Sequence, residues 1–284
     1  MRIPLLALTV SLALVPAARA ADAPRTETHT SSSPAGEVRA ELSYVKKSEF
    51  EYSDVRLKIT RAGQVLLDAA VPAPCRECPT IPAAANADED SAQLVDLDKN
   101  GEPEVVVDLY TGGAHCCLFS QIYGFDAAGN VYRRWKQDWG DVGYTLKDLD
   151  GDGSPEFRSA DWRFSSAFTA YVLTGFPIQV WKYGGLKMND VTRGYRNLIK
   201  ASLRSHLKLY KQIRRDKDLP DVRGFLAAYT AEKYLLGQGD TALDLVYAAY
   251  RRGELRAQPG GDDEARGKRY ITALRKFLRQ TGYR

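Results

Sequence analysis

The sequence predicts an α+β protein in which an antiparallel β-rich domain precedes a helical domain. Up to about residue 189, short runs rich in β-branched and aromatic residues alternate with turn pairs such as Ala62-Gly63 and Gly129-Asn130, a pattern typical of antiparallel strands. Beyond Asp190, apolar residues recur at helical spacing. We therefore expect a propeller-blade-like or sandwich β domain over residues 37–189 and a helical domain over residues 190–284.

The charge distribution supports the same division. Residues 1–181 contain 17 basic and 25 acidic side chains, whereas residues 182–284 contain 23 basic and 11 acidic ones. Such an asymmetry indicates two parts with different surfaces.

The first 20 residues predict a secretory signal peptide. Arg2 precedes the apolar stretch 5–15, and Ala18-Arg19-Ala20 provides the small residues of a cleavage site. The apolar stretch is shorter than the roughly twenty residues that span a bilayer, so we expect no transmembrane segment. We expect a periplasmic or secreted protein. Residues 21–36 have almost no large apolar side chains and are expected to form a flexible lead-in.

Eight strands and four helices are expected along the chain. The strands are 38–44, 55–59, 65–71, 105–110, 121–125, 131–135, 156–164 and 178–183. The helices are 195–210, 221–236, 240–252 and 262–280, each with an apolar face. Asp240 is the expected N-cap of the third helix, while Gly237 and Gly253 follow helix ends.

Two acidic segments share one spacing and lie 52 residues apart. They read Asp96-Leu-Asp98-Lys-Asn100-Gly101-Glu102-Pro-Glu104 and Asp148-Leu-Asp150-Gly-Asp152-Gly153-Ser154-Pro-Glu156. Oxygen-bearing side chains at positions 1, 3, 5 and 9 of a tight loop can converge on one hard cation, and glycine at position 6 permits the turn. Calcium is the expected ion, in a structural role, because it accepts many oxygen ligands in flexible geometry. An EF-hand is excluded, because its bidentate Glu at position 12 is replaced by Val107 and Ser159.

These segments resemble the calcium loops of FG-GAP or VCBS repeats, which are the blade units of integrin-type β-propellers. The resemblance covers about residues 94–107 and 146–157, roughly a tenth of the chain. It implies that Asp96, Asp98, Asn100 and Glu104 ligate one ion and that Asp148, Asp150, Asp152 and Glu156 ligate another. Two copies are too few for a complete propeller, so the resemblance does not extend to the global fold. The second loop is the stronger candidate, because Lys99 and Asn100 reduce the negative charge of the first.

A cysteine-rich segment follows the first loop. It reads Thr111-Gly112-Gly113-Ala114-His115-Cys116-Cys117, and Cys75 and Cys78 lie upstream. In an oxidising compartment two disulfides are expected. Disulfides that join Cys75 and Cys78 to Cys116 and Cys117 are expected to form more easily, although pairing within each of these two sets stays open. Zinc held by Cys75, Cys78, His115 and Cys116 is a less favoured alternative, and a thioredoxin-like CxxC is less favoured still, because Cys78 is followed by a loop rather than a helix.

The combination of an acidic loop with this segment also resembles uncharacterised exported bacterial proteins. That resemblance supports the architecture and implies no activity. His115, with Gly112 and Gly113, is the expected functional surface, because His29 lies in the lead-in and His206 lies on an apolar helix face. No nucleophile elbow, phosphate loop or zinc-protease motif occurs.

The sequence thus predicts an exported calcium-binding structural or ligand-binding module, with no catalytic residue assigned. The alternative is an envelope hydrolase or thiol-redox enzyme centred on His115 and the cysteines. The basic helices are expected to meet an anionic envelope component or protein. Nucleic acid is not an expected partner, because the chain is exported and its β part lacks interleaved basic and aromatic residues.

Overall fold

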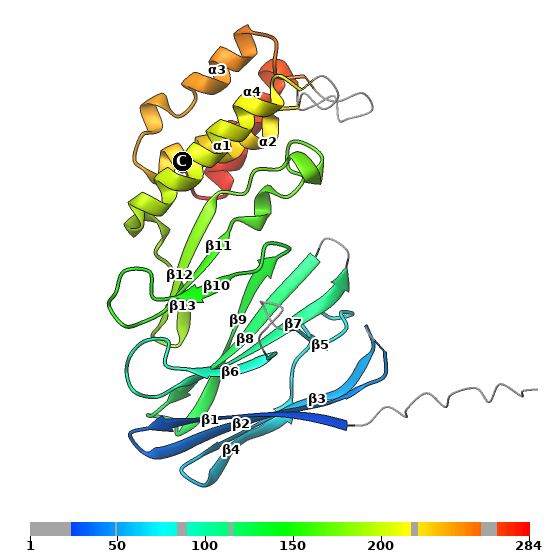
Figure 1. The fold of residues 1–284 in the computed structure, drawn as a ribbon, viewed down its shortest axis with the longest axis vertical. Coiled ribbons are helices and arrows are strands. Elements are labelled where there is room, and N and C mark those ends of the chain that lie inside the picture. The colour runs from blue at the N-terminus through cyan, green and yellow to red at the C-terminus, as the bar shows by residue number, and fades with distance from the viewer. Residues whose placement is uncertain (1–23, 49, 84–89, 114–115, 217–220, 257–265) are drawn as a thin grey trace, which may run out of the picture.

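The computed structural model describes residues 24–48, 50–83, 90–113, 116–216, 221–256 and 266–284. Three antiparallel sheets are stacked along the long axis of the molecule, and the helices cover the far end of the stack (Figure 1). In the first and third sheets the strands follow one another in sequence order, whereas in the second sheet both β5 and β6 pair with β7. The α+β class with an antiparallel N-terminal part is therefore confirmed. The predicted signal peptide lies outside the described residues.

The first sheet is a meander of four strands in the order β1-β2-β3-β4. They are β1 (Pro24–Ser33), β2 (Gly36–Lys46), β3 (Tyr52–Arg61) and β4 (Gln64–Ala70). Most of the expected flexible lead-in thus forms β1, which pairs with β2 from Pro24 opposite Val45 to Ser33 opposite Gly36. The prediction of a flexible segment was wrong because it relied on composition. Strand β1 is an edge strand rich in Thr and Ser, and backbone hydrogen bonds to β2 hold it without an apolar face.

The second sheet lies in the middle of the stack and is buried on both faces. Its strands are β5 (Ile81–Pro82), β6 (Ala92–Val95), β7 (Glu104–Gly113), β8 (Cys116–Asp126) and β9 (Val131–Gly140). Val105 and Val107 pack with the first sheet, whereas Val106 between them packs with the third. Successive side chains of a strand point to opposite faces, so a continuous apolar run fits a sheet covered on both sides.

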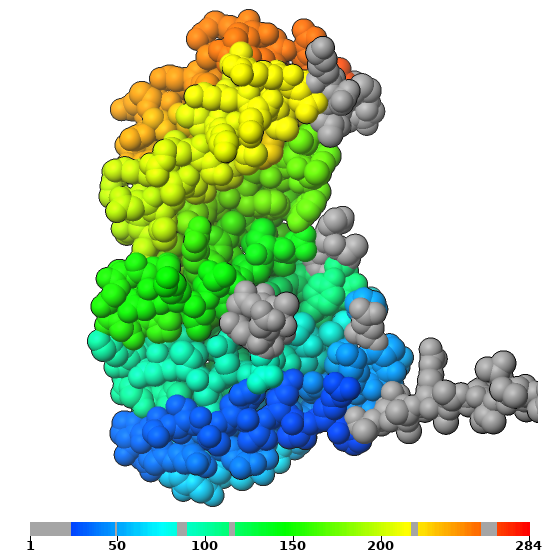
Figure 2. Space-filling model, viewed as in Figure 1, coloured from blue at the N-terminus to red at the C-terminus, as the bar shows by residue number. Residues whose placement is uncertain are grey.

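The third sheet connects the stack to the helices. It consists of β10 (Thr145–Lys147), β11 (Glu156–Ala160), β12 (Ile178–Gly184) and β13 (Lys187–Asp190). The expected strand 156–164 ends earlier, because Asp161 caps the short 3₁₀ helix η1 (Trp162–Phe164) by accepting a hydrogen bond from the backbone N–H of Arg163. Figure 2 shows this sheet in green, between the middle sheet and the yellow and orange helices.

The described residues after β13 form four α-helices. They are α1 (Arg196–Ile213), α2 (Arg223–Leu235), α3 (Asp244–Arg251) and α4 (Gly267–Gln280). Gly237 and Gly253 take the expected left-handed conformation after α2 and α3, with φ of 74° and 70°. Asp240 is not the N-cap of α3, because it lies in the separate 3₁₀ helix η4 (Gly239–Thr241) and Leu243 occupies the cap position.

The helical core extends across the expected domain boundary. Phe164, Phe168 and Ile178 from the β-rich part belong to the same buried cluster as the inward residues of all four helices. The secondary structure changes from strands to helices near residue 190 as predicted, but one hydrophobic core includes residues from both sides of this point. Within the described part of the chain, no helix is long and apolar enough to cross a membrane.

Candidate metal centre

The first acidic loop connects β6 to β7 and is held by its own backbone. Asp96 accepts hydrogen bonds from the N–H groups of Asn100 at 3.1 Å and Gly101 at 2.9 Å. Gly101 has φ of 86°, in the left-handed region that glycine tolerates best. The Glu104 side chain reaches back from the start of β7 and accepts the Leu97 N–H at 2.9 Å. These bonds bring positions 1 and 9 of the loop together.

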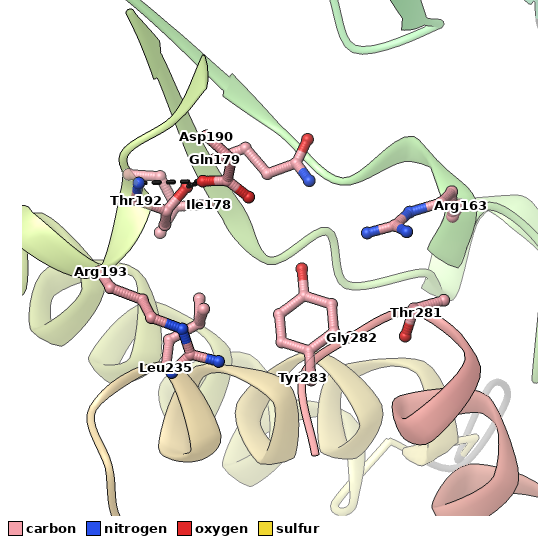
Figure 3. Close-up of a pocket in the computed structure, with 10 residues that line it drawn as sticks. All are labelled: Arg163, Ile178, Gln179, Asp190, Thr192, Arg193, Leu235, Thr281, Gly282 and Tyr283. Atoms are coloured by element: carbon pink, nitrogen blue, oxygen red, sulfur yellow. Dashed lines mark hydrogen bonds between the residues drawn. The ribbon is translucent and has the colours of Figure 1, made fainter.

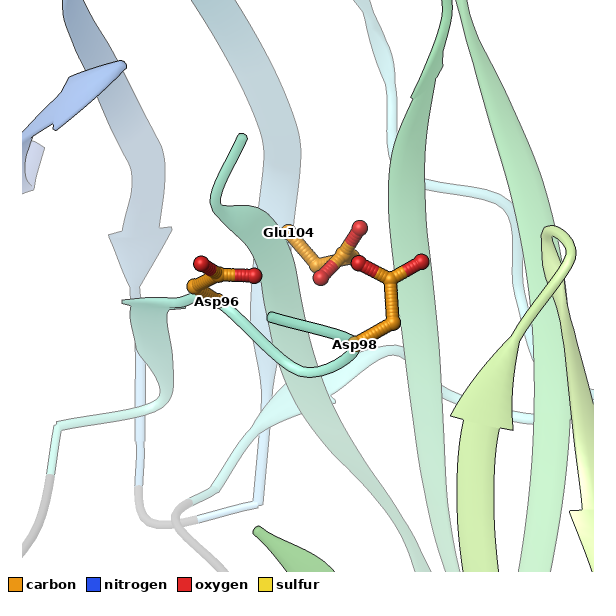
Figure 4. Close-up of side chains that lie close together, drawn as sticks. All are labelled: Asp96, Asp98 and Glu104. Atoms are coloured by element: carbon orange, nitrogen blue, oxygen red, sulfur yellow. The ribbon is translucent and has the colours of Figure 1, made fainter. Parts of the chain in front are cut away.

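Three carboxylates of this loop converge on one point. Asp96, Asp98 and Glu104 each offer an oxygen, and these oxygens lie within 4.8 Å of one another; Figure 4 shows the three side chains directed toward a common space. Glu104 is only 2% exposed, and burial, reinforced by the charges of Asp98 and Asp96, raises its pKa to about 8. At neutral pH and without a cation, the Glu104 carboxyl therefore holds a proton, which a bound metal ion would displace.

The second acidic loop repeats this geometry between β10 and β11. Asp148 accepts from Gly151 at 2.7 Å and from Gly153 at 3.0 Å, while Glu156 accepts from Leu149 at 2.9 Å. Gly153 has φ of 88°, close to the value for Gly101. Oxygens of Asp148, Asp150 and Glu156 again lie within 4.8 Å of one another. The matched spacing therefore folds into matched loops at equivalent places in successive sheets.

At position 5, Asp152 is not part of the second triad, and the first loop has the amide of Asn100 in place of a carboxylate. Asn100 Oδ1 accepts the Glu102 N–H at 2.7 Å, and Asp152 Oδ1 accepts the Ser154 N–H at 2.8 Å. These bonds shape the turn, and an accepting oxygen keeps a second lone pair. The structure thus brings six of the eight predicted ligands into two triads.

Two lysines and a tyrosine beside the second loop were not anticipated from the sequence. Lys182 Nζ lies 2.5 Å from Asp152 Oδ2 and 3.1 Å from Glu156 Oε1, and the hydrogen bond from Lys182 lowers the pKa of Asp152. Lys99 Nζ, from the first loop, donates to the Asp152 carbonyl at 2.5 Å. Tyr195 donates to Asp150 Oδ2 at 3.0 Å. The two loops are therefore neighbours in space, joined by Lys99.

An ion pair fastens the first loop to the first sheet. Arg61 of β3 donates to both carboxylate oxygens of Glu102, at 2.9 and 2.7 Å, and its guanidinium lies 4.0 Å from the centre of the Phe125 ring. Both charged side chains are largely buried. Such a bidentate pair over an aromatic ring restricts the loop far better than an exposed pair would.

The structure describes one local disulfide and the oxidised state of Cys117. Cys75 and Cys78 form a disulfide with their Cα atoms 5.1 Å apart, and Cys117 is also disulfide-bonded. The expectation of bonds from Cys75 and Cys78 to the second pair is therefore wrong, because a two-residue turn already brings their sulfurs together. As a disulfide they offer no thiolate to zinc or to redox and nucleophilic chemistry.

The expected functional surface around His115 is described only in part. His115 lies outside the described residues. Gly112 has φ of 78° and packs under Pro79 and Ile81, and Gly113 pairs with Cys116 where β7 and β8 meet. The two glycines therefore lie where the pairing register between β7 and β8 shifts.

Comparisons with known proteins cover both parts of the chain. A family model described as "sll0997 C-terminal domain" matches residues 200–282, which contain the helices. An uncharacterised protein, y4bJ, of Sinorhizobium fredii is 28% identical over 266 residues, covering 88% of this chain and 40% of that protein. A probable thylakoid lumen protein, sll0997, of Synechocystis is 29% identical over 218 residues, covering 67% of this chain and 60% of that protein. The chain thus spans about half the length of these curated relatives, and no solved structure matches it.

The matched helical region carries an uninterrupted row of cations. Helix α1 contains no Asp or Glu. Along one face of α1 and into the turn after it, basic side chains are exposed three or four residues apart: Lys200, Arg204, Lys208, Lys211 and Arg215. None of these five forms a salt bridge with a described residue. Leu207 lies among them and lines a shallow groove with four of the five. The row is a second candidate surface.

A small pocket also lies where the third sheet meets the end of α4. Gln179, Asp190 and Tyr283 line it, with Arg163 and Arg193 on either side (Figure 3). Its polar groups are engaged within the protein, since Tyr283 donates to Asp161 and Thr192 donates to Asp190. Its volume of about 60 Å³ leaves room for only one or two water molecules.

Proposed function

We propose that the chain is an exported calcium-binding module whose ion stabilises the stack of sheets. Support for export comes from the predicted signal peptide and from the thylakoid lumen relative, and the site of action would be the periplasm or the medium. The observation that carries the calcium proposal is the buried Glu104, which converges with Asp96 and Asp98 in a loop that a second segment repeats. Hard oxygen ligands in a flexible turn favour Ca²⁺ over Mg²⁺, which requires a strict octahedron.

Thermal unfolding tests this proposal. With calcium about 100-fold above the dissociation constant, binding stabilises the folded state by about 2.7 kcal/mol, which raises the melting midpoint by about 5–10 °C in a chain of this size. The Asp98→Asn variant should lose this increment, because it removes a charge from the triad. Asp240→Asn, at an exposed position in η4, is the matched control and should keep it. The same midpoint for the wild type in calcium and in chelator would refute the proposal.

The row of cations on α1 favours a second candidate function, the contact with an anionic envelope component. We take anionic lipid as that component. Five aligned charges beside the apolar Leu207 suit a lipid surface, to which each Lys or Arg contributes about 1 kcal/mol. Such an attraction falls steeply as salt is added.

Vesicle sedimentation tests this second function. The protein should bind vesicles that contain phosphatidylglycerol but not vesicles of phosphatidylcholine alone. Replacing Lys200, Lys208 and Lys211 by Gln should weaken binding about 100-fold. Replacing Lys147, Arg158 and Lys187, which are exposed cations of the third sheet, removes the same charge and should change binding little. Equal losses in both triple variants would show a net-charge effect and reject α1 as the contact surface.

A further inference from the structure

Strand β12 supplies one side chain to each acidic loop. Lys182 and Tyr183 are consecutive residues of β12, so their side chains point to opposite faces of the third sheet. Lys182 reaches the second loop, whereas Tyr183 belongs to the core shared with the middle sheet, near the first loop. A single strand therefore gives the two loops different chemical surroundings.

The second loop already holds a positive charge. The Lys182 ammonium lies within ion-pair distance of Asp152 and of Glu156, which is completely buried. The contact with Glu156 Oε1 is electrostatic, because its geometry falls short of a hydrogen bond. Tyr195 and Lys99 add hydrogen bonds to Asp150 and to the Asp152 carbonyl. Several oxygens that would ligate a metal ion are thus engaged by the protein.

The first loop holds no comparable charge. No described Lys, Arg or His forms a salt bridge with Asp96, Asp98 or Glu104. Asp98 Oδ1 is buried and accepts no hydrogen bond from a described residue, and the same holds for the hydroxyl of Tyr183, which is only 2% exposed. The Tyr183 hydroxyl lies against Gly124, which follows Tyr123, and Tyr123 is paired with Val105 directly after Glu104. Burial and the negative charges of Glu104 and Asp98 raise the pKa of Tyr183.

Tyr183 is also fixed in this position. A Cβ on Gly124 of β8 would lie 2.2 Å from the Tyr183 hydroxyl oxygen, so glycine is required where the ring end passes the strand. A buried hydroxyl and a buried carboxylate oxygen without partners cost free energy. A bound cation with its water would satisfy both groups.

We propose that only the first loop binds a divalent cation, and that the Lys182 ammonium takes the place of the ion in the second loop. This inference rests on the proposed calcium binding and assigns it to one site. Tyr183 acts as a positioning residue that contacts a water molecule bound to the ion. Loop charge alone ranks the second loop as the better cation site. The proposal reverses this ranking, because Lys182 neutralises the second loop and Lys99 donates a hydrogen bond to it.

The number of calcium ions bound per chain, measured by isothermal titration with CaCl₂, tests the assignment. The wild type should bind one ion, and Lys182→Met should bind two, because the second loop is then free. Lys187→Met, at an exposed cation of the neighbouring strand β13, is the matched control and should still bind one. Tyr183→Phe should bind one ion about tenfold more weakly.

The outcomes separate this inference from the proposed function. Two ions in the wild type would overturn the assignment and leave calcium binding intact, whereas none would remove the proposed function itself. One ion in Lys182→Met would reject the lysine as the internal cation. Lys182→Gln provides a second neutral variant should Lys182→Met unfold, and Lys182→Arg, which keeps the charge, should still bind one ion.

Discussion

Replacement of Asp221 by alanine is expected to lower the free energy of unfolding by about 3–5 kcal/mol. Asp221 precedes α2 and forms a bidentate pair with Arg223, at 2.8 and 2.6 Å, and the two residues are 2% and 3% exposed. Thr169 adds a hydrogen bond to Asp221 at 2.6 Å. Removing the carboxylate takes a bidentate partner away from a buried guanidinium, which is far more costly than loss of an exposed pair.

Urea denaturation followed by circular dichroism measures this loss. Two variants serve as controls. Asp240→Ala removes an exposed carboxylate near α3 and should change stability by less than about 0.5 kcal/mol. Asp221→Leu combined with Arg223→Met should be more stable than Asp221→Ala alone, because the buried guanidinium is then replaced by an apolar side chain. A double variant as unstable as the single one would show that the cost comes from lost packing rather than from the charge.

The hydrogen bonds around Asp221 and Arg223 extend beyond the helices. Thr169 lies in the segment between β11 and β12, and Tyr270 of α4 donates to the Arg223 carbonyl at 2.6 Å. The network therefore connects the third sheet, α2 and α4. Asp221→Ala should loosen the attachment of the helices to the sheets while the hydrogen bonds within each acidic loop remain.

Local patterns predicted much of the fold and the geometry of the loops. Runs of β-branched and aromatic residues located β2, β3, β7 and β12, and the positions of Asp96 and Gly101 within a nine-residue frame predicted a turn that the structure repeats at Asp148 and Gly153. These features depend on neighbours in sequence, such as side chains that accept backbone N–H groups a few residues away.

Features that depend on distant neighbours could not be predicted. Strand β1 has no apolar pattern and is defined by pairing with β2, and β5 is only two residues long. Lys182 lies 30 residues from Asp152, so loop spacing gives no sign of it. The split of the β-rich part into three sheets likewise follows from which faces pack together. Sequence patterns therefore found the candidate ligands, while tertiary contacts distinguish the two loops.

Trp139→Ala is expected to cost about 3–5 kcal/mol, because it removes the largest buried side chain between the middle and third sheets. Trp139 is 1% exposed, and its ring centre lies 5.4 Å from that of Phe157 and 4.7 Å from that of Tyr144. Its Nε1–H donates to Ser120 at 2.7 Å. Aromatic contacts of this kind add to the free energy of area burial.

Urea denaturation of Trp139→Phe separates the cavity from the hydrogen bond. The phenyl ring retains most of the packing but leaves the Ser120 hydroxyl without its donor, so a loss of about 1–3 kcal/mol is expected. Ser120 also donates to the buried Asp108, which accepts a second hydrogen bond from Tyr144 at 2.8 Å. The variant therefore acts on a connected polar network as well as on the core. Phe157, which packs against Trp139, directly follows Glu156 of the second loop. If Trp139→Ala lowers the free energy of unfolding by less than about 1 kcal/mol, this core does not hold the second loop in place.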